Sequence, residues 1–311
     1  MTQPAVVVLG TGIMARGIAA GFLAAGTPVV LLGRSTERAA AAAAEAGSLA
    51  GALPQAAAGS IGPAGCEAGA FEGWDAWEGV ALVIETIAED LDAKRALFAA
   101  LDARVPPGVP IGSNSSGYPI TRIAQGLPTR ARMMGVHYFM PAHVVPLVEV
   151  VLGEHTDAAL AERVCALYRA AGKSPVLVRR DIPGFLANRI QHALMREALA
   201  LIDAGVATAE DVDLAVRHSF GFRYAAVGPI LQKEISGWDT VLRAAQEIYP
   251  SLSTDAEPAR CLRELVAAGR TGMKSGAGFM DWPPERARAV RADYDRKLAA
   301  AFAILASDET G

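Results

Sequence analysis

The chain has 311 residues, of which 52% are hydrophobic and 20% charged, and its formal net charge is −4. This length exceeds what one simple core usually holds, so two domains are expected. The acidic balance argues against a nucleic acid or an anionic membrane as partner, and no apolar run approaches the about 18–20 residues that a spanning helix needs.

Short β-branched and leucine-rich runs alternate with alanine-rich helical stretches through the first half of the chain. This alternation is typical of βαβ units and predicts a parallel sheet covered by helices on both faces. The expected strands are Val6–Leu9, Pro28–Leu32, Ala81–Glu85, Val109–Gly112, Met133–Val136 and Val148–Leu152. The expected helices are Ile13–Ala25, Ser35–Ala46, Asp90–Arg104 and Asp157–Ala171. The pattern indicates a Rossmann-type, doubly wound α/β domain.

The segment Gly47–Gly79 interrupts this alternation. It is rich in glycine and alanine, contains Pro54 and Pro63, and shows no clean period. We therefore expect a loosely packed, partly helical excursion between two strands.

A domain boundary is expected near Arg180–Gly184, because only helical patterns follow it. They cover Phe185–Asp203, Ala209–Arg217, Pro229–Ile248, Asp255–Ala268 and Glu285–Ala306. Residues 1–182 are thus predicted to form a dinucleotide-binding domain, and residues 183–311 an all-α domain.

The first residues and the cysteines both favour a cytoplasmic protein. Residues 1–4 show no basic region and no cleavage site, so no secretory signal is expected. The three cysteines, Cys66, Cys165 and Cys261, are widely scattered, and no metal site can be built from their spacing. We expect reduced thiols and no metal.

The run Gly10-Thr11-Gly12-Ile13-Met14-Ala15 follows the first expected strand and opens the first expected helix. Gly10 permits a tight turn, and Gly12 lets a pyrophosphate approach the backbone at the helix N-terminus. The strand before the motif and the helix after it favour a dinucleotide site over a glycine-rich turn without a ligand. Cofactor contacts are expected from Gly10, Gly12, Ile13 and Met14.

The end of the second expected strand bears on the choice of cofactor. NAD sites usually carry Asp or Glu there, but this chain has Gly33, followed by Arg34-Ser35-Thr36. Without a carboxylate, a guanidinium and two hydroxyls are suited to a 2′-phosphate, which favours NADP over NAD. The alternative is that Ser35 only caps the next helix and Arg34 is solvated.

Polar residues stand where later strands are expected to end. Ser113–Gly117 follows the fourth strand, His137 the fifth, and Glu149 lies in the sixth. Oxidation of a secondary alcohol needs a base for the hydroxyl proton, and a histidine backed by a carboxylate meets that need. Taken alone, the two residues are equally consistent with a satisfied structural pair.

Further motifs occur in order along nearly the whole chain. They are Val83–Glu85, Glu89–Leu91, Lys94–Phe98, Ser113–Ser116, His137–Phe139, Pro146–Glu149, Pro183–Arg189 and Lys274–Phe279. Together they resemble the L-3-hydroxyacyl-CoA dehydrogenase family.

The resemblance implies roles for particular residues. His137 is the expected general acid/base, and Glu149 the carboxylate that orients and charges it. Ser116 and Asn188 are expected to hold the substrate oxygen, the alternatives being a turn residue and a polar group on a helix face. The resemblance also implies a homodimer formed through the helical domain. Additional cofactor contacts are expected from Glu89, Lys94 and Asn114, although Lys94 fits a structural role better than a catalytic one.

The chain departs from the family's pattern in ways that bear on the substrate. Met140 stands where the family usually has asparagine, beside the base. No lysine or arginine occurs between Arg38 and Lys94, where CoA-specific members place an arm that contacts CoA. Phosphate groups need cations, so this stretch predicts poor recognition of a CoA thioester.

Other segments resemble members that act on free small acids, namely the gulonate dehydrogenase/lambda-crystallin group and a pyridine-carboxylate dehydrogenase. These segments are Ser116–Thr121 and Gly221–Ala225, and within the second Arg223 is suited to pairing with a substrate carboxylate. A surface or interdomain ion pair is the alternative for Arg223. Met140 is also expected to contact the substrate.

The leading hypothesis is an NADP-dependent oxidoreductase that interconverts a small (S)-3-hydroxy acid or related secondary alcohol with its ketone. One alternative is an NAD-dependent 3-hydroxyacyl-CoA dehydrogenase of fatty-acid metabolism. The other is a catalytically silent, dinucleotide-binding structural protein.

Overall fold

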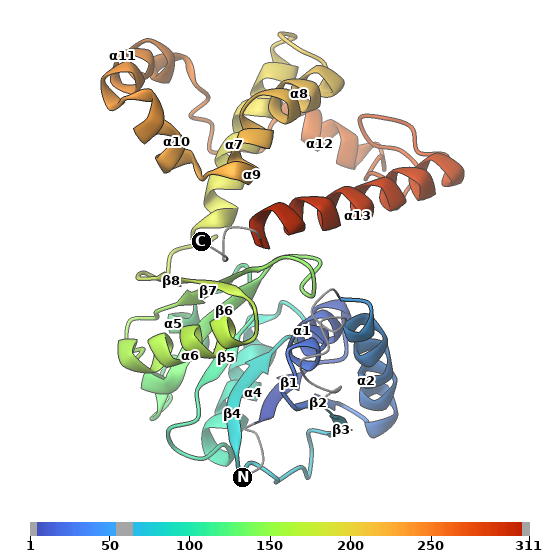
Figure 1. Cartoon of the computed structure of the whole chain (residues 1–311), viewed down its shortest axis with the longest axis vertical. Helices are drawn as coiled ribbons and strands as arrows, with labels where there is room; N and C mark the ends of the chain where they lie inside the picture. Colours follow the sequence, from blue (N-terminus) through green and yellow to red (C-terminus); the bar gives the residue numbers. More distant parts are fainter. Residues whose placement is uncertain (1–4, 54–64, 307–311) are drawn as a thin grey trace. The chain divides into compact units, whose positions relative to one another are not determined.

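The structure is a computed structural model that describes residues 5–53 and 65–306 (Figure 1). Two compact units divide the chain, the first over Met1–Arg189 and the second over Ile190–Gly311. The sequence analysis predicted the domain boundary slightly earlier, after residue 182. The first unit therefore includes the first three residues of one helix, α7 (Ala187–Asp203).

The first unit is built on one eight-stranded sheet with the order β3-β2-β1-β4-β5-β6-β7-β8. Its strands are β1 Ala5–Leu9, β2 Val29–Gly33, β3 Cys66–Ala70, β4 Val80–Glu85, β5 Ile111–Ser113, β6 Met133–Tyr138, β7 Leu147–Val151 and β8 Ser174–Val178. All neighbouring strands pair in parallel except β6 and β7, which are antiparallel. The predicted α/β class is confirmed.

Helices cover both faces of this sheet, as Figure 1 shows. The helices are α1 Ile13–Ala24, α2 Thr36–Gly51, α4 Leu91–Arg104, α5 Ile120–Ile123 and α6 Ala158–Ala170. Side chains of α1, α2 and α6 share one apolar cluster, and those of α4 and α5 share the other. The central strands are buried on both sides, which explains their continuous apolar runs.

Local signals in the sequence set where these helices begin. Ser35 caps α2, Asp90 caps α4 and Asp157 caps α6, each accepting hydrogen bonds from backbone N–H groups of the first turn. Such caps satisfy N–H groups that have no partner inside the helix. The predicted starts of these three helices therefore agree with the structure to within a residue.

Two strands were missed by the sequence analysis. β3 lies within the predicted excursion Gly47–Gly79, and β8 lies just before the predicted boundary. Both are edge strands with weak local signals, because β3 lacks β-branched residues and β8 contains Pro175. These two segments form strands because each pairs with a neighbouring strand of the sheet. Residues 54–64, with Pro54 and Pro63, and the residues 1–4 considered for a signal lie outside the described residues.

The second unit is helical, as predicted. Its helices are α7 Ala187–Asp203, which starts in the first unit, α8 Ala209–Val216, α9 Phe222–Ala226, α10 Pro229–Ser236, α11 Trp238–Ile248, α12 Arg260–Ala267 and α13 Pro284–Ala306. A π-helical turn, Arg217–Gly221, joins α8 to α9. The predicted helix Pro229–Ile248 is divided at Gly237, whose φ of 88° ends α10.

Within residues 5–53 and 65–306, no helix combines the length and apolar character needed to cross a bilayer. Cys66, Cys165 and Cys261 are all free thiols.

Candidate active site

The register between two antiparallel strands brings His137 and Glu149 together. His137 on β6 is the direct partner of Glu149 on β7. Residues opposite each other in an antiparallel pair point to the same face of the sheet, with Cβ atoms about 5 Å apart. The His137 Nδ1 and Glu149 Oε2 atoms are 2.8 Å apart, and both side chains are buried. Strand pairing alone thus preorganises the predicted dyad.

Ser116 extends this pair into a chain of three groups. Its Oγ lies 3.0 Å from Nε2 of His137, and its residue is exposed whereas the histidine is buried. An ionised carboxylate only accepts hydrogen bonds, so Nδ1 of His137 carries the proton toward Glu149. Nε2 is then left as the acceptor that faces Ser116. This tautomer is the one that a general base requires.

Backbone amides hold the other oxygen of Glu149. The N–H groups of Leu186 and Ala187 donate to its Oε1 over 3.0 and 2.7 Å. Burial alone would raise the pKa of Glu149, but the hydrogen bonds from His137 and from these two amides outweigh it and hold the pKa below its usual value. Glu149 is therefore an anion, although it is fully buried.

Aromatic rings enclose His137. The Phe139 ring meets it edge to face at 4.7 Å between centroids, and the Phe185 ring lies 5.4 Å away. Phe185 is buried and has a positive φ of 50°, a rare conformation for a bulky residue. These rings keep water from the dyad, which strengthens the attraction between imidazole and carboxylate.

A lysine fixes the loop that joins the two dyad strands. Lys173 Nζ donates to the carbonyl oxygens of Ala142 and Val145 over 2.8 and 3.0 Å. Burial lowers the pKa of Lys173 to about 8. A neutral amine keeps two N–H bonds, so both hydrogen bonds survive its deprotonation.

Glu89 holds the loop that carries Ser116. Its Oε1 accepts from Oγ of Ser115 at 2.6 Å and from the N–H of Gly117 at 2.8 Å, the residues on either side of Ser116. Burial raises the pKa of Glu89, but these hydrogen bonds and the nearby ammonium of Lys94 lower it below its usual value. Glu89 therefore acts as an anionic clamp on the Ser116 loop.

The amine of Lys94 lies next to the Glu89 carboxylate. It is 1% exposed and lies 2.6 Å from Glu85 Oε1 and 3.3 Å from Glu89 Oε2. Ser113 Oγ donates to the other oxygen of Glu85 over 2.6 Å. Lys94 was predicted to contact the cofactor while fitting a structural role better than a catalytic one, and its ammonium lies between two carboxylates. This position supports a structural role.

Asn114 joins two neighbouring strands at the same edge of the sheet. Its Oδ1 accepts from the N–H of Tyr138 over 2.9 Å. Asn114 thereby fixes the end of β6 next to His137, and its amide group lies at the carboxyl end of β5, where cofactors bind in doubly wound sheets.

The glycine loop after β1 fits a dinucleotide. Gly10 has a φ of 131°, and a Cβ there would lie 2.3 Å from Oγ1 of Thr86, so glycine is required. Gly12 has open space where a Cβ would point, and no side chain caps the start of α1. The free N–H groups and the positive end of the helix dipole suit a pyrophosphate. Ile13 is 60% exposed at this point and Met14 partly buried.

The end of β2 shows both features that the sequence left open. Ser35 Oγ accepts from the N–H of Arg38 over 3.4 Å, so it caps α2. Arg34 and Thr36 are exposed, and in the described residues Arg34 has no hydrogen bond or ion pair. A Cβ on Gly33 would lie 2.8 Å from Cγ2 of Thr11, so a side chain at this position requires Thr11 to shift.

The remaining predicted residues fall in different places. Met140 is 60% exposed, two residues beyond the end of β6. Asn188 is the second residue of α7 and follows the two amides that bind Glu149. Arg223 belongs to α9 of the second unit, where its Nε donates to the carbonyl of Ser219 over 3.1 Å.

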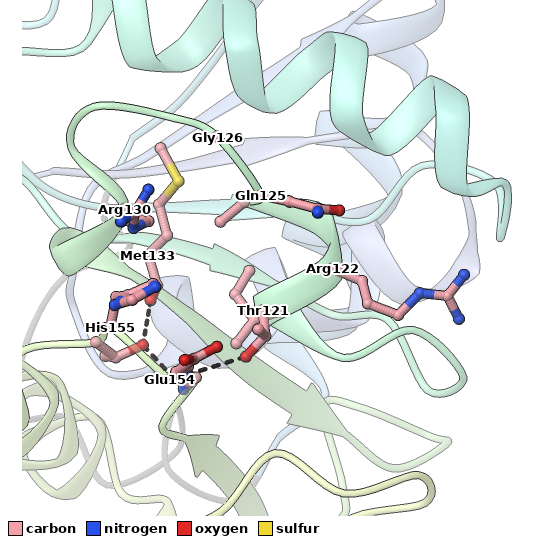
Figure 2. A pocket seen from close by; sticks show the side chains of 12 residues that line it. Thr121, Arg122, Gln125, Gly126, Arg130, Met133, Glu154 and His155 are labelled. Atoms are coloured by element: carbon pink, nitrogen blue, oxygen red, sulfur yellow. Dashed lines mark hydrogen bonds between the residues drawn. The ribbon is translucent and has the colours of Figure 1, made fainter.

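A hollow of about 320 Å³ lies at the opposite end of β6 (Figure 2). It is lined by Met133, which is four residues from His137 or about 13 Å along an extended strand. Figure 2 shows Arg122 pointing away from Arg130 and His155, and the hydroxyl of Thr121 already accepts from the N–H of Glu154. The lining groups do not converge on one point, so this hollow is not the candidate site.

Sequence reasoning missed the groups that support the dyad. It assigned no role to Glu85, Ser115, Phe185 or the backbone amides of Leu186 and Ala187. Glu85 alone gave a signal, as an acidic residue that closes a fully apolar strand. The amides gave none, because any residue except proline supplies the same N–H group.

Comparison with known proteins bears on these observations. The protein-family model described as 3-hydroxyacyl-CoA dehydrogenase, NAD binding domain, matches residues 5–182. The family model described as 3-hydroxyacyl-CoA dehydrogenase, C-terminal domain, matches residues 184–282. The two matches meet close to the predicted boundary.

Two relatives are similar over most of their length. One is the 5-formyl-3-hydroxy-2-methylpyridine 4-carboxylate 5-dehydrogenase of Mesorhizobium japonicum, 34% identical over 235 residues, which are 76% of this chain and 76% of the relative. The other is the L-carnitine dehydrogenase of Streptomyces coelicolor, 39% identical over 215 residues, 67% of this chain and 68% of the relative. Both names denote dehydrogenases of small molecules without CoA.

A crystal structure extends the similarity to the whole chain. It is described as 5-formyl-3-hydroxy-2-methylpyridine 4-carboxylic acid 5-dehydrogenase, an NAD⁺-dependent dismutase. The TM-score is 0.88 at 30% identity, and the match covers 98% of this chain and 99% of that one.

Proposed function

The chain belongs to the 3-hydroxyacyl-CoA dehydrogenase family, and from this premise we propose that it interconverts a small (S)-3-hydroxy acid, or a related secondary alcohol, with its ketone. The observation that carries the proposal is the continuous chain from exposed Ser116 through His137 to Glu149. It ends in an anion buried among hydrogen-bond donors. A scaffold that only bound a dinucleotide would not need to bury such a chain.

His137 handles the proton in this proposal. Its Nε2 takes the proton of the substrate hydroxyl during oxidation and returns it during reduction, while Ser116 donates a hydrogen bond to the same oxygen. The imidazolium formed is stabilised by anionic Glu149 at Nδ1. A nicotinamide cofactor, when bound, accepts or supplies the hydride.

The residues between β2 and β4 support a substrate without CoA. No cation occurs from residue 39 to residue 93, and the region carries Glu45, Glu67, Glu72, Asp75 and Glu78. Among the described residues of this region, those up to Gly51 belong to α2, and Cys66–Ala70 form the edge strand β3. A CoA thioester brings several phosphate charges, which this surface would repel. The names of the relatives, which refer to carnitine and to a pyridine carboxylate, also support a substrate without CoA.

We expect acetoacetyl-CoA to be a poor substrate compared with a small free ketoacid or aryl ketone, and free CoA not to inhibit. The measurement is kcat/KM for CoA-linked and free ketones, each with both cofactors. A clear advantage for the thioester would restore the alternative of a 3-hydroxyacyl-CoA dehydrogenase. Absence of turnover with every ketone would favour the silent structural protein.

We further propose that NADP is preferred over NAD. The support is local: no carboxylate stands at Gly33, and Arg34 is exposed beside the hydroxyls of Ser35 and Thr36. Relatives bind NAD, and one is named NAD⁺-dependent, so the proposal sets this chain apart from them.

Replacement of Arg34 by alanine should weaken the binding of NADPH by about 1–3 kcal/mol, the contribution of a hydrogen bond to a charged group. The binding of NADH should stay nearly unchanged. Titration of both cofactors measures this. Arg38→Ala is the matched control, since Arg38 is also exposed but one turn further along α2. The variant Gly33→Asp should shift preference toward NADH, and more so together with Thr11→Ser, which removes the methyl that a side chain at position 33 would meet. NADH binding to the native protein as tightly as NADPH would refute the proposal.

We also propose a homodimer formed through the helical unit. Among described residues 190–306, Leu199 is the one hydrophobic side chain that is buried, whereas Ile230, Ile235, Leu242 and Tyr249 are 61–74% exposed. Helices of this kind are stabilised mainly by burying an apolar face, which a second copy would supply.

Sedimentation should therefore give twice the mass of one chain at micromolar concentration. Ile235→Glu together with Leu242→Glu should produce a monomer, and Glu234→Gln with Arg243→Gln, charged neighbours on the same helices, should not. A native protein that sediments as a monomer would exclude this interface.

A further inference from the structure

Helix α7 begins without a residue suited to start it. Its first residue is Ala187, preceded by Phe185 and Leu186. The first N–H groups of a helix have no partner inside it, and Ser, Thr, Asp or Asn usually supplies the missing acceptor. The side chains of leucine and phenylalanine have no acceptor atom. The helices α2, α4 and α6 each have a capping side chain from a residue next to their start, whereas α7 needs an acceptor from elsewhere in the chain.

Glu149 is that source. Its Oε1 accepts from the N–H groups of Leu186 and Ala187 over 3.0 and 2.7 Å, although the residues are 37 and 38 positions apart in sequence. Gly184 and Phe185 both have positive φ angles, 75° and 50°. Left-handed residues followed by helical ones turn successive N–H groups toward one point, which makes a small anion-binding concavity. The carboxylate also lies at the positive end of the helix dipole.

The two oxygens of Glu149 serve different groups. Oε2 faces Nδ1 of His137, and Oε1 faces the start of α7. Asn188, which the family resemblance implies holds the substrate oxygen, directly follows the second bound amide. The position of Asn188 therefore depends on the same carboxylate that orients the base.

We propose that Glu149 positions two parts of the site: it orients His137, and it acts as the long-range cap of α7. One carboxylate therefore fixes the positions of His137 and Asn188 relative to each other. The strained backbone at Phe185 is the consequence of turning both amides toward one oxygen, and the Phe185 ring, packed against His137, offsets that strain. The inference rests on the proposed function only for the role of Asn188.

Three variants separate the two roles of Glu149. Glu149→Gln keeps an oxygen for the amides but loses the charge beside His137. Glu149→Leu loses both, and His137→Ala removes the base while leaving the cap. Hydrogen exchange at residues 186–189 and thermal unfolding are measured without substrate or cofactor, so both remain interpretable if the proposed reaction is wrong.

In Glu149→Leu, exchange at Leu186 and Ala187 should rise about tenfold or more, and the unfolding midpoint should fall by about 2–8 °C, the usual effect of a lost cap. In Glu149→Gln and His137→Ala, exchange should stay within about threefold of the native protein. With an active substrate, both Glu149 variants should lose kcat, but only Glu149→Leu should also raise KM by about fivefold or more, the effect of one misplaced hydrogen bond.

A local cap should rescue one role and not the other. Leu186 is 45% exposed, so Leu186→Ser is accommodated and offers a hydroxyl to the start of α7. Added to Glu149→Leu, it should restore the unfolding midpoint and lower KM while kcat stays low; Leu186→Ser alone gives the baseline. If Glu149→Leu does not fold, Glu149→Ala removes the same oxygens with less bulk. Unchanged exchange and KM in the variant without these oxygens, with the loss confined to kcat, would overturn the proposal.

Discussion

Replacement of His137 by alanine should lower turnover by a factor of about 10²–10⁴ and leave cofactor binding intact. The reason is that only proton transfer is lost. His137 is buried, its ring packs against Phe139 and Phe185, and its nitrogens face Ser116 and Glu149, whereas the glycine loop that suits the dinucleotide follows a different strand, β1. Steady-state rates with an active ketone, and fluorescence titration of the reduced cofactor, give the two quantities.

His155→Ala is the matched control for this experiment. That histidine is exposed and lines the hollow at the other end of the sheet, so its loss should leave the rate unchanged. Near-native turnover in His137→Ala would mean that the dyad is structural and that another group moves the proton. Parallel loss of cofactor binding would instead indicate a damaged fold.

Replacement of Lys94 by methionine should lower the free energy of unfolding of the first unit by about 3–5 kcal/mol, because it leaves a buried charge without its partner. Glu85 is fully buried and would keep only the hydroxyl of Ser113 and the N–H of Ile87. Methionine has nearly the length of lysine, so the effect reports charge more than volume. Thermal unfolding should show a midpoint lower by about 10 °C.

A second substitution tests the cause. Glu85→Gln added to Lys94→Met removes the unpaired charge, and the double variant should recover much of the loss. Arg95→Met, one residue along α4 at an exposed hydrogen bond, should cost less than about 1 kcal/mol. If Lys94→Met melts within about 2 °C of the native protein, the buried pair contributes no net stability.

Patterns of short range determined the fold class. Alternating apolar runs, together with capping residues such as Ser35, Asp90 and Asp157, act within a few residues of themselves, so the sequence alone places α2, α4 and α6. The glycine motif is also recognised locally, from the strand before it and the helix after it, although the space that excludes a Cβ at Gly10 is set by the distant Thr86. The edge strands β3 and β8 were missed because their stability comes from a neighbouring strand, a partner that local patterns do not contain.

The chemistry of the site was determined partly by sequence and partly by tertiary structure. Motifs named Ser116, His137 and Glu149, but residue types alone left a structural pair as an equal interpretation. Only the antiparallel register of β6 and β7 makes His137 and Glu149 direct partners, and a shift by one residue would turn one side chain to the other face. Only the folded chain brings the amides of Leu186 and Ala187 to Glu149 and buries Lys94 between Glu85 and Glu89. The physical reason is the same in each case: a backbone amide or a buried charge acquires its role from what surrounds it, and those surroundings come from parts of the chain that are distant in sequence.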